Sequence, residues 1–224
     1  MPRPTPPPFA YETRCVIFVD ILGWSALVRR STTDAAARSQ IAKAYDRFSR
    51  TTRFVQGMEA TDPERELGWA ATFLSDSIAF SCRPEHASAL LDHVASDFAF
   101  LLLRQELYVR GAIVLGEVYH RGDVIIGPAL VDAVEHEKAA CFPRIVVADT
   151  AASLVPEEMT LRDVDGVRFL NFLALAAANE GVGTNNLRRA REVVERKLAA
   201  DAASPVLMTK HQWLARYISS LEDS

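Results

Sequence analysis

The chain has 224 residues, 49% of them hydrophobic and 24% charged, which suits one folded domain with a substantial core. Its net charge of −4 excludes the broad basic surface that binding to long nucleic acid requires, so any phosphate binding should be local. Three widely spaced cysteines without a Cys-x-x-Cys motif predict reduced thiols in a cytoplasmic protein, and no apolar run approaches the ~20 residues of a membrane-spanning helix.

The first predicted elements are one strand and two helices. Residues 1–10 are rich in proline, and we expect them to form a flexible lead-in. The apolar run at residues 15–19 predicts a strand that is buried on both faces. Asp20 ends this run, and helices are predicted to begin near Ser25 and to span residues 33–54.

Strands and helices alternate through the middle of the chain. A polar loop is predicted over residues 59–66, and the sequence Ser75-Asp76-Ser77 predicts a hairpin turn between two strands. The predicted elements from there on are those two strands over 67–74 and 78–82, a helix over 84–105, a strand over 107–115, a hairpin over 117–126, a helix over 127–140 and a strand over 144–149.

This order of elements predicts an α+β fold with a ferredoxin-like βαββαβ core, an antiparallel-rich sheet and helices on one face. The other face must be covered or must bind something. Extra C-terminal helices are predicted over residues 185–200 and 208–221, with Pro205 interrupting between them. We expect one domain over residues 11–180, on which a helical extension over residues 181–224 packs.

Two aspartates are the strongest candidates for chemistry. Asp20 leaves a buried strand, where an unpaired carboxylate is costly, and Asp76 lies at the hairpin tip. Should the strand lie beside the hairpin, both would offer hard oxygen ligands for Mg²⁺ or Mn²⁺ at one sheet edge. The alternative is that Asp20 caps the next helix and that Asp76 is ordinary turn chemistry. Residue type and spacing alone leave both open.

Four motifs in the same order resemble the class III adenylate and guanylate cyclases. Phe-Val-Asp-Ile-Leu-Gly-Trp-Ser at residues 18–25 resembles the family's first signature, and Leu-Ser-Asp-Ser at 74–77 stands where the family has a Gly-Asp hairpin. The stretches from residue 109 to 130 and Pro-Arg-Ile-Val-Val at 143–147 resemble the motifs that follow. The resemblance covers roughly residues 13–175 and implies the fold of that family's catalytic domain.

The resemblance implies a nucleotidyl cyclase whose active sites lie between the two subunits of a homodimer. Asp20 and Asp76 would hold two Mn²⁺ or Mg²⁺ ions, with the Ile21 carbonyl as a further ligand. Arg110 would bind the β- or γ-phosphate and take part in catalysis. Backbone N–H groups at a helix start favour phosphates, and the other positions implied to bind the nucleotide are Phe18, Leu22, Gly23, Trp24 and Ser25.

The chain departs from the purine cyclases where that family reads the base. The family's lysine four residues before the hairpin aspartate is Thr72 here, followed by Phe73, and its later base-reading position is Val124. The family's asparagine and catalytic arginine fall on Val131 and Glu135. Losing a transition-state arginine costs orders of magnitude in rate. The chain is therefore either a degenerate cyclase or one with other residues in those roles.

The second option agrees with a resemblance to the Pycsar pyrimidine cyclases of bacterial anti-phage defence. It is carried by residues 18–25 and 74–77, by the helix that contains Glu-His-Glu-Lys, and by Lys-His-Gln-Trp-Leu-Ala-Arg-Tyr at 210–217. Tyr45 is the candidate that touches the base, although it would equally suit an amphipathic helix face, and Thr72 and Phe73 are further lining candidates. Arg168 is the candidate replacement for the family's phosphate-binding lysine.

The resemblance thus implies a cytoplasmic cyclase that converts UTP, or less favourably CTP, to the 3′,5′-cyclic monophosphate and diphosphate. The product would be a second messenger for antiviral defence, read by a separate effector protein. No nucleic-acid partner and no membrane insertion are expected. The alternatives are a catalytically degenerate cyclase-like protein that binds a nucleotide or a partner, and an interaction module without any nucleotide.

Overall fold

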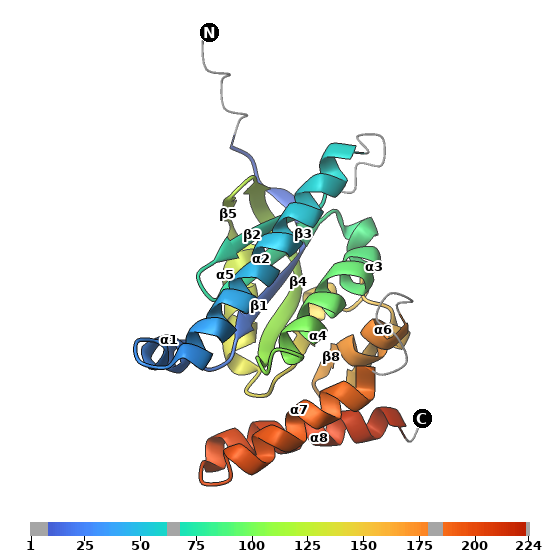
Figure 1. Ribbon diagram of the computed structural model, residues 1–224. Coiled ribbons are helices and arrows are strands. Elements are labelled where there is room, and N and C mark those ends of the chain that lie inside the picture. Colours follow the sequence, from blue (N-terminus) through green and yellow to red (C-terminus); the bar gives the residue numbers. More distant parts are fainter. Residues whose placement is uncertain (1–8, 62–67, 179–185, 223–224) are drawn as a thin grey trace.

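A sheet with helices on both faces forms the protein, and the computed structural model describes residues 9–61, 68–178 and 186–222 (Figure 1). The strand order is β2-β3-β1-β4-β6-β8-β7, and β5 pairs with β4 outside this path. Every strand pair is antiparallel except β4 with β6. The strands are β1 (Glu12–Ile21), β2 (Ala70–Leu74), β3 (Ser77–Cys82), β4 (Val109–Arg121), β5 (Val124–Ile126), β6 (Ile145–Val147), β7 (Thr160–Arg162) and β8 (Arg168–Leu170). The α+β class and the antiparallel-rich sheet expected from the sequence are confirmed.

Strand β1 lies at the centre of the sheet and is buried on both faces, as its continuous apolar sequence predicts. Successive side chains of a strand point to opposite faces. Ile17 and Val19 accordingly belong to the large core under most of the helices, whereas Val16 and Phe18 belong to a second, smaller core. Asp20 continues the alternation of Val16 and Phe18 and therefore faces the smaller core.

The main helical layer consists of α1 (Trp24–Ser31), α2 (Ala35–Thr61) and the run at residues 87–103. Asp34 begins α2 by accepting a hydrogen bond from the Ala36 N–H at 2.8 Å, which confirms the predicted helix start. The helix runs on past residue 54 because apolar residues such as Val55 keep one side in the core. Residues 59–61 of the predicted loop are therefore helical, and residues 62–66 lie outside the described part.

The predicted helix over residues 84–105 is a composite. It contains α3 (Ala87–Leu90), a π-helical segment (Leu91–Ser96) and α4 (Asp97–Leu103). The Ser96 hydroxyl donates to the Leu91 carbonyl at 2.9 Å and bridges the wider π turn. The apolar stripe that predicted one continuous helix gives no signal for this change of hydrogen-bond pattern.

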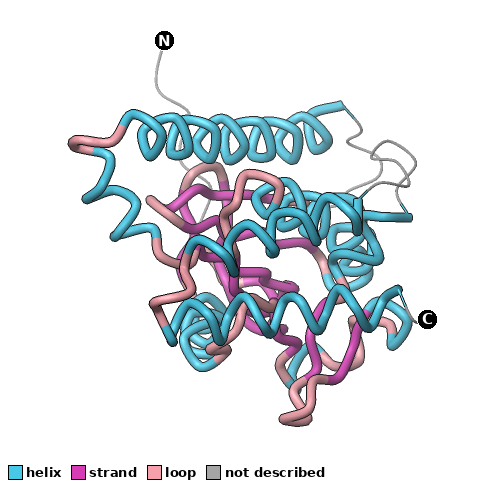
Figure 2. Tube along the Cα trace, turned by 60° about the horizontal axis from the view of Figure 1, so that its bottom comes forward, coloured by secondary structure: helices cyan, strands magenta, loops and turns pink. Residues whose placement is uncertain are grey.

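Helix α5 (Pro128–Ala139) covers part of the opposite face of the sheet. It crosses β4 closely, since a Cβ on Gly116 would lie 3.1 Å from the Ala129 Cβ. Figure 2 shows the strands between helices on either side. The second face, which the sequence required to be covered or to bind something, is thus covered only in part by helix.

The C-terminal third contains elements that the sequence did not predict. Strands β7 and β8 have three residues each, too few for an alternating pattern, and α6 (Phe172–Ala178) follows them. Helices α7 (Asn186–Ala200) and α8 (Pro205–Glu222) come next, and α8 begins at Pro205 rather than at residue 208. A proline is tolerated in the first helical turn, where its missing N–H has no intrahelical partner. Val194 and Trp213 join the main core, so this extension packs on the same body.

Within the described residues, the helices are too short or too polar for any of them to cross a membrane.

Candidate active site

The strand register places Asp20, Ser77 and Arg110 in one row. Asp20 lies opposite Ser77 of β3 on one side and opposite Arg110 of β4 on the other. The Ile21 N–H donates to the Asp76 carbonyl at 3.1 Å, so the hairpin tip lies beside the end of β1. The structure therefore brings Asp20, Asp76 and Arg110 to the same edge of the sheet.

The charges of these groups influence one another. The pKa of Asp20 is raised to about 7 by burial and by the neighbouring carboxylates of Glu137 and Asp76, and Arg110 only partly offsets this rise. Like charges that share a site disfavour the ionised form. A divalent cation near Asp20 and Asp76 would relieve this repulsion.

Glu137 is a site residue that the sequence analysis missed. Its side chain forms an ion pair with Arg110 through the Arg110 Nε, and only 3% of Glu137 is exposed. Burial raises the pKa of Glu137, and the Arg110 cation lowers it. Since Nε is the atom held by Glu137, the two terminal nitrogens of the guanidinium are left for another acceptor.

Helical spacing is the sequence signal that could have identified Glu137 as a buried residue. Ala129, Ala133 and Glu137 follow at intervals of four and are the buried residues of α5, whereas Glu135 is exposed. Glu135 corresponds only to a position of the resembled family. The buried face of α5 brings the other glutamate into the site.

The loop after β1 supplies fewer free amides than predicted. The Leu22 N–H donates to the Tyr108 carbonyl at 2.8 Å, which corrects its assignment as an amide facing phosphate. Gly23 has φ of 79° and stands just before α1, whose first helical bond is donated by the Leu27 N–H to the Gly23 carbonyl. The N–H groups of Trp24 and Ser25 belong to the first turn and lack intrahelical acceptors.

An aromatic hollow lies beside the hairpin on the main helical face. It has a volume of about 440 Å³, and Trp24, Tyr45, Phe73 and Ser75 are among its lining residues. Tyr45 is 59% exposed, and its ring lies edge-on to that of Phe73 at 6.1 Å. Trp24, Tyr45 and Phe73 are thus together, but Phe73 faces α2, on the opposite side of the sheet from the Asp20 carboxylate.

Thr72 lies on the same face as Asp20 but is buried within a chain of polar groups. Arg14 Nε donates to the Ser81 hydroxyl at 2.9 Å, Ser81 contacts His120 Nδ1 at 2.8 Å, and His120 Nε2 contacts the Thr72 hydroxyl at 2.9 Å. The Thr72 hydroxyl also donates to the Gly122 carbonyl at 3.2 Å. Burial and the Arg14 cation lower the pKa of His120 to about 3, which keeps the ring neutral.

Two other predicted site residues are enclosed by protein. Phe18 is buried in the smaller core under α5. Arg168 cannot replace a phosphate-binding lysine, which corrects that expectation. All three of its guanidinium nitrogens are engaged, with Thr160 Oγ1 at 3.0 Å, the Ala152 carbonyl at 2.9 Å and the Val155 carbonyl at 2.5 Å.

The positions that depart from the family are exposed. Val131 is 57% exposed on α5, and Glu135 on the same helix and Val124 on β5 are also exposed. All three are therefore accessible from outside the chain.

The donor set fits a magnesium or manganese ion that is held jointly with a substrate. The described residues contain no cluster of three or more His, Cys, Asp or Glu side chains arranged around a metal position. Mg²⁺, however, is usually bound through one or two carboxylates, with waters and substrate phosphates completing the shell. Asp20 and Asp76 supply that number of carboxylates at one edge.

Comparison with solved structures shows which fold the chain shares. No family model and no curated protein matches the sequence. The structure of a bacterial light-regulated adenylyl cyclase superposes with a TM-score of 0.52 and 16% identity, covering 82% of this chain and 57% of that one. The adenylyl cyclase CyaB from P. aeruginosa superposes with a TM-score of 0.48 and 18% identity, covering 72% of this chain and 94% of that one. The chain therefore spans little more than half of the light-regulated protein and shares the fold of cyclase catalytic domains.

Proposed function

From the nucleotidyl cyclase fold and the two carboxylates at its edge, we propose that this chain is a nucleotidyl cyclase that closes a nucleoside triphosphate to its 3′,5′-cyclic monophosphate. The observation that carries the proposal is the convergence of Asp20 and Asp76 beside Arg110. Two acidic ligands and one cation are the groups that phosphoryl transfer needs, because it depends on positioning and charge neutralisation.

Each residue then has a distinct task. Asp20 and Asp76 would hold two Mn²⁺ or Mg²⁺ ions, together with the Ile21 carbonyl. These ions acidify the ribose 3′-hydroxyl and neutralise the phosphates when bound. Arg110 uses its free terminal nitrogens to bind the phosphate oxygens that leave as diphosphate. Glu137 orients that guanidinium by holding Nε, and the first-turn amides of α1 face the phosphates.

A pyrimidine substrate, with UTP favoured over CTP, is proposed from the sequence resemblance, which also makes Tyr45 the candidate that touches the base. The Tyr45 ring is 59% exposed beside the hairpin, and stacking of a base on an aromatic ring contributes about 1–3 kcal/mol. Tyr45→Ala should therefore raise KM for the pyrimidine triphosphate about tenfold. Phe54→Ala is the matched control, since Phe54 is an exposed aromatic residue on the same helix. An equal change in both variants would contradict a role for Tyr45.

A homodimer is the proposed assembly, because the sequence resemblance implies active sites that lie between two subunits. The β4–β5 hairpin supports this, since Val124 and Ile126 are exposed on it and Phe9 stacks on Tyr119 at 4.8 Å. Such exposed apolar side chains favour contact with a second copy. The product would act as a second messenger for antiviral defence through a separate effector, in line with the sequence resemblance.

The decisive test incubates the purified protein with each of the four NTPs and Mn²⁺ and identifies the products by mass spectrometry. We expect a cyclic pyrimidine monophosphate, and less than about 1% of that rate for Asp20→Ala and Asp76→Ala. Asp149→Ala is the control, because Asp149 is an exposed aspartate that also follows a buried strand. Wild-type turnover by a folded Asp20→Ala or Asp76→Ala protein would refute the proposal.

The second candidate is a degenerate cyclase that binds a nucleotide without cyclising it. The exposure of Val131 and Glu135, in place of the two transition-state side chains, favours it. An NTP with Mn²⁺ would then raise the melting temperature, but the mass spectrum would contain no cyclic product.

A further inference from the structure

The candidate site is bordered on one side by residues 108–111, where β4 begins. Arg110 lies opposite Asp20 in the strand register. Two residues before Arg110, the Tyr108 carbonyl accepts the Leu22 N–H at 2.8 Å, so the loop after Asp20 is hydrogen-bonded to the main chain of this segment. The position of residues 108–111 therefore determines both where the Arg110 side chain begins and where that loop lies.

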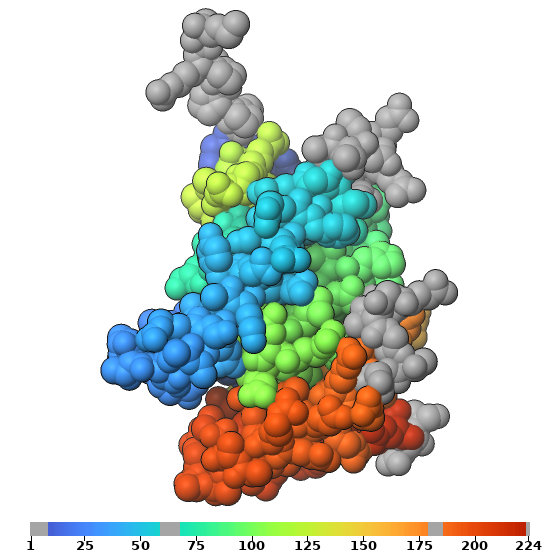
Figure 3. Space-filling view, in the orientation of Figure 1, coloured from blue at the N-terminus to red at the C-terminus, as the bar shows by residue number. Residues whose placement is uncertain are grey.

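The side chain of Tyr108 fixes the first end of this segment to both C-terminal helices, which lie together along the lower side of the molecule in Figures 1 and 3. Tyr108 is 7% exposed, and its hydroxyl lies 3.0 Å from Nδ1 of His211 on α8. The other ring nitrogen of His211, Nε2, lies 2.9 Å from Asp201 Oδ2. The Lys197 ammonium on α7 lies 5.5 Å from the centroid of the Tyr108 ring. The residue that holds Leu22 is thus itself held by the C-terminal extension.

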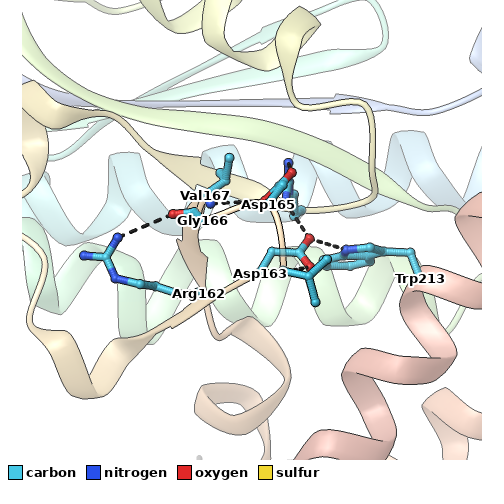
Figure 4. Close-up of polar contacts among 8 residues, drawn as sticks. Arg162, Asp163, Asp165, Gly166, Val167 and Trp213 are labelled. Atoms are coloured by element: carbon cyan, nitrogen blue, oxygen red, sulfur yellow. Dashed lines mark hydrogen bonds and ion pairs between the residues drawn. The ribbon is translucent and has the colours of Figure 1, made fainter.

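A second set of contacts fixes the other end of the segment to α8. The Gly111 N–H donates to the Arg144 carbonyl at 3.0 Å. The Arg144 guanidinium binds Asp163 Oδ2 at 2.5 Å, and Trp213 Nε1 on α8 donates to the same oxygen at 2.5 Å (Figure 4). Arg144 and Trp213 are each 3% exposed, so these hydrogen bonds lie in a low-dielectric interior, where they are stronger than in water.

We propose that α8 positions the active site, with His211 and Trp213 as positioning residues that act through Tyr108 and Arg144. This inference rests on the proposed function. The two side chains hold, at both its ends, the segment that carries Arg110. Phosphoryl transfer depends on where the cation and the metal ligands stand relative to the phosphates, and a misplacement of about 1 Å can cost about 100-fold in rate. The C-terminal motif that carries part of the sequence resemblance contains both residues and thereby has a physical role.

Two buried tyrosines give a matched pair of variants. Tyr108→Phe removes the hydroxyl that His211 holds. Tyr217→Phe is the control, because Tyr217 is also buried and lies on α8, but its hydroxyl binds Asn171 Oδ1 at 2.7 Å and the Leu173 N–H at 3.1 Å. Both variants lose one buried hydroxyl and should melt below wild type, but only the first releases β4 from α8.

The first readout is amide hydrogen exchange in the ligand-free protein, followed residue by residue by NMR. The Leu22 amide should exchange about tenfold faster in Tyr108→Phe than in wild type, and at the wild-type rate in Tyr217→Phe. His211→Phe keeps a ring, removes both hydrogen bonds of His211 and should act like Tyr108→Phe, so the test stands where one variant does not fold. The second readout is turnover with Mn²⁺ and an NTP. Tyr108→Phe should lower kcat about tenfold with little change in KM, whereas Tyr217→Phe should change neither.

Equally fast exchange of the Leu22 amide in Tyr108→Phe and Tyr217→Phe would reveal a general loss of stability and would overturn the inference. Exchange at the wild-type rate in Tyr108→Phe and His211→Phe would also overturn it. Neither result depends on whether a cyclic product forms. A cyclising wild-type protein whose Tyr108→Phe variant keeps its kcat would leave the proposed function intact and remove the positioning role from α8. Faster Leu22 exchange in Tyr108→Phe alone of the matched pair, without any cyclic product from wild type, would support the hold of α8 on this segment and count against cyclisation.

Discussion

At the scale of single residues, the charge on Asp20 is costly until a cation is present. Its pKa of about 7 lies above the value of about 3.9 in an unfolded chain. The folded protein therefore binds more protons between these values, and this carboxylate lowers stability as pH rises from 4 to 7. Above pH 7 its full cost is present in the metal-free protein.

Asp20→Asn should consequently stabilise the metal-free protein at pH 8, by a few degrees in melting temperature. The same variant should lose the stabilisation that Mn²⁺ with an NTP gives to wild type. Melting temperatures measured with and without Mn²⁺ and the NTP check both expectations, and Asp149→Asn is the control. A variant that melts lower without metal would contradict the electrostatic account of this site.

His120 has the opposite dependence on pH. Its pKa of about 3 in the folded protein lies below the value of about 6.5 in an unfolded chain, so the unfolded chain binds more protons between these values. The stability that depends on neutral His120 is complete above pH 6.5 and decreases as pH falls, by at most about 1.4 kcal/mol per pH unit.

His120→Gln should remove that part of the pH dependence while lowering stability at pH 7.5. Urea unfolding of wild type and variant at several values between pH 5 and 7.5 gives the comparison. Their free energies of unfolding should converge as pH falls, because only wild type takes up a proton at position 120 when it unfolds. Parallel curves would show that the chain from Arg14 to Thr72 does not hold a neutral histidine.

At the scale of elements, the close approach of β4 to β1 sets the geometry of the site. A Cβ on Gly111 would lie 2.3 Å from the Phe18 carbonyl oxygen, which no side chain can tolerate without moving a strand. Gly111 pairs with Val19, the neighbour of Asp20. The absence of a side chain there lets Arg110 stand opposite Asp20.

Gly111→Ala should therefore destabilise the protein by more than about 3 kcal/mol, beyond the usual range for a single substitution. Gly57→Ala is the contrasting change, because Gly57 is helical and its added Cβ would meet nothing within 4 Å. Alanine there should stabilise α2 by roughly 0.5–1 kcal/mol. Denaturant titration gives the free energy of unfolding of both variants. A Gly111→Ala variant as stable as wild type would contradict the close packing of β4 on β1.

Sequence patterns were informative where one residue pair or one periodic run decides the structure. The apolar run before Asp20 and the turn at Asp76 gave the central strand, the hairpin and their shared edge. The face of the sheet on which a side chain lies was harder to predict, because a shift of one residue in the strand register reverses that face. Thr72 and Phe73 are neighbours in sequence, yet their side chains lie on opposite faces of β2. Counting residues back from the hairpin aspartate did not distinguish these two faces.

Long-range contacts explain what remained hidden. Glu137 enters the site because α5 packs on β4, and α8 is held in place because His211 contacts Tyr108 and Trp213 contacts Asp163. Strands β7 and β8 depend on pairing between segments too short to carry a pattern. These arrangements arise from packing between distant parts of the chain, which local propensity does not encode.

At the scale of the whole molecule, the proposed active site requires a second copy of the chain. Val124→Glu combined with Ile126→Glu should shift the protein to monomer and lower specific activity at least tenfold, while leaving its circular dichroism unchanged. The substitutions place like charges where two apolar hairpins would meet. Sedimentation velocity gives the oligomeric state. An active monomer would contradict a site shared between subunits.

The carboxylates of Asp20, Asp76 and Glu137, together with the Arg110 cation, leave this region with a formal excess of negative charge. A fully ionised nucleoside triphosphate carrying two divalent ions has no net charge, so its entry leaves that excess unchanged. Ionic strength acts on interactions between net charges. Uptake of the metal-loaded nucleotide should thus vary little between dilute and concentrated salt, whereas the bare triphosphate meets a region that already carries its own sign.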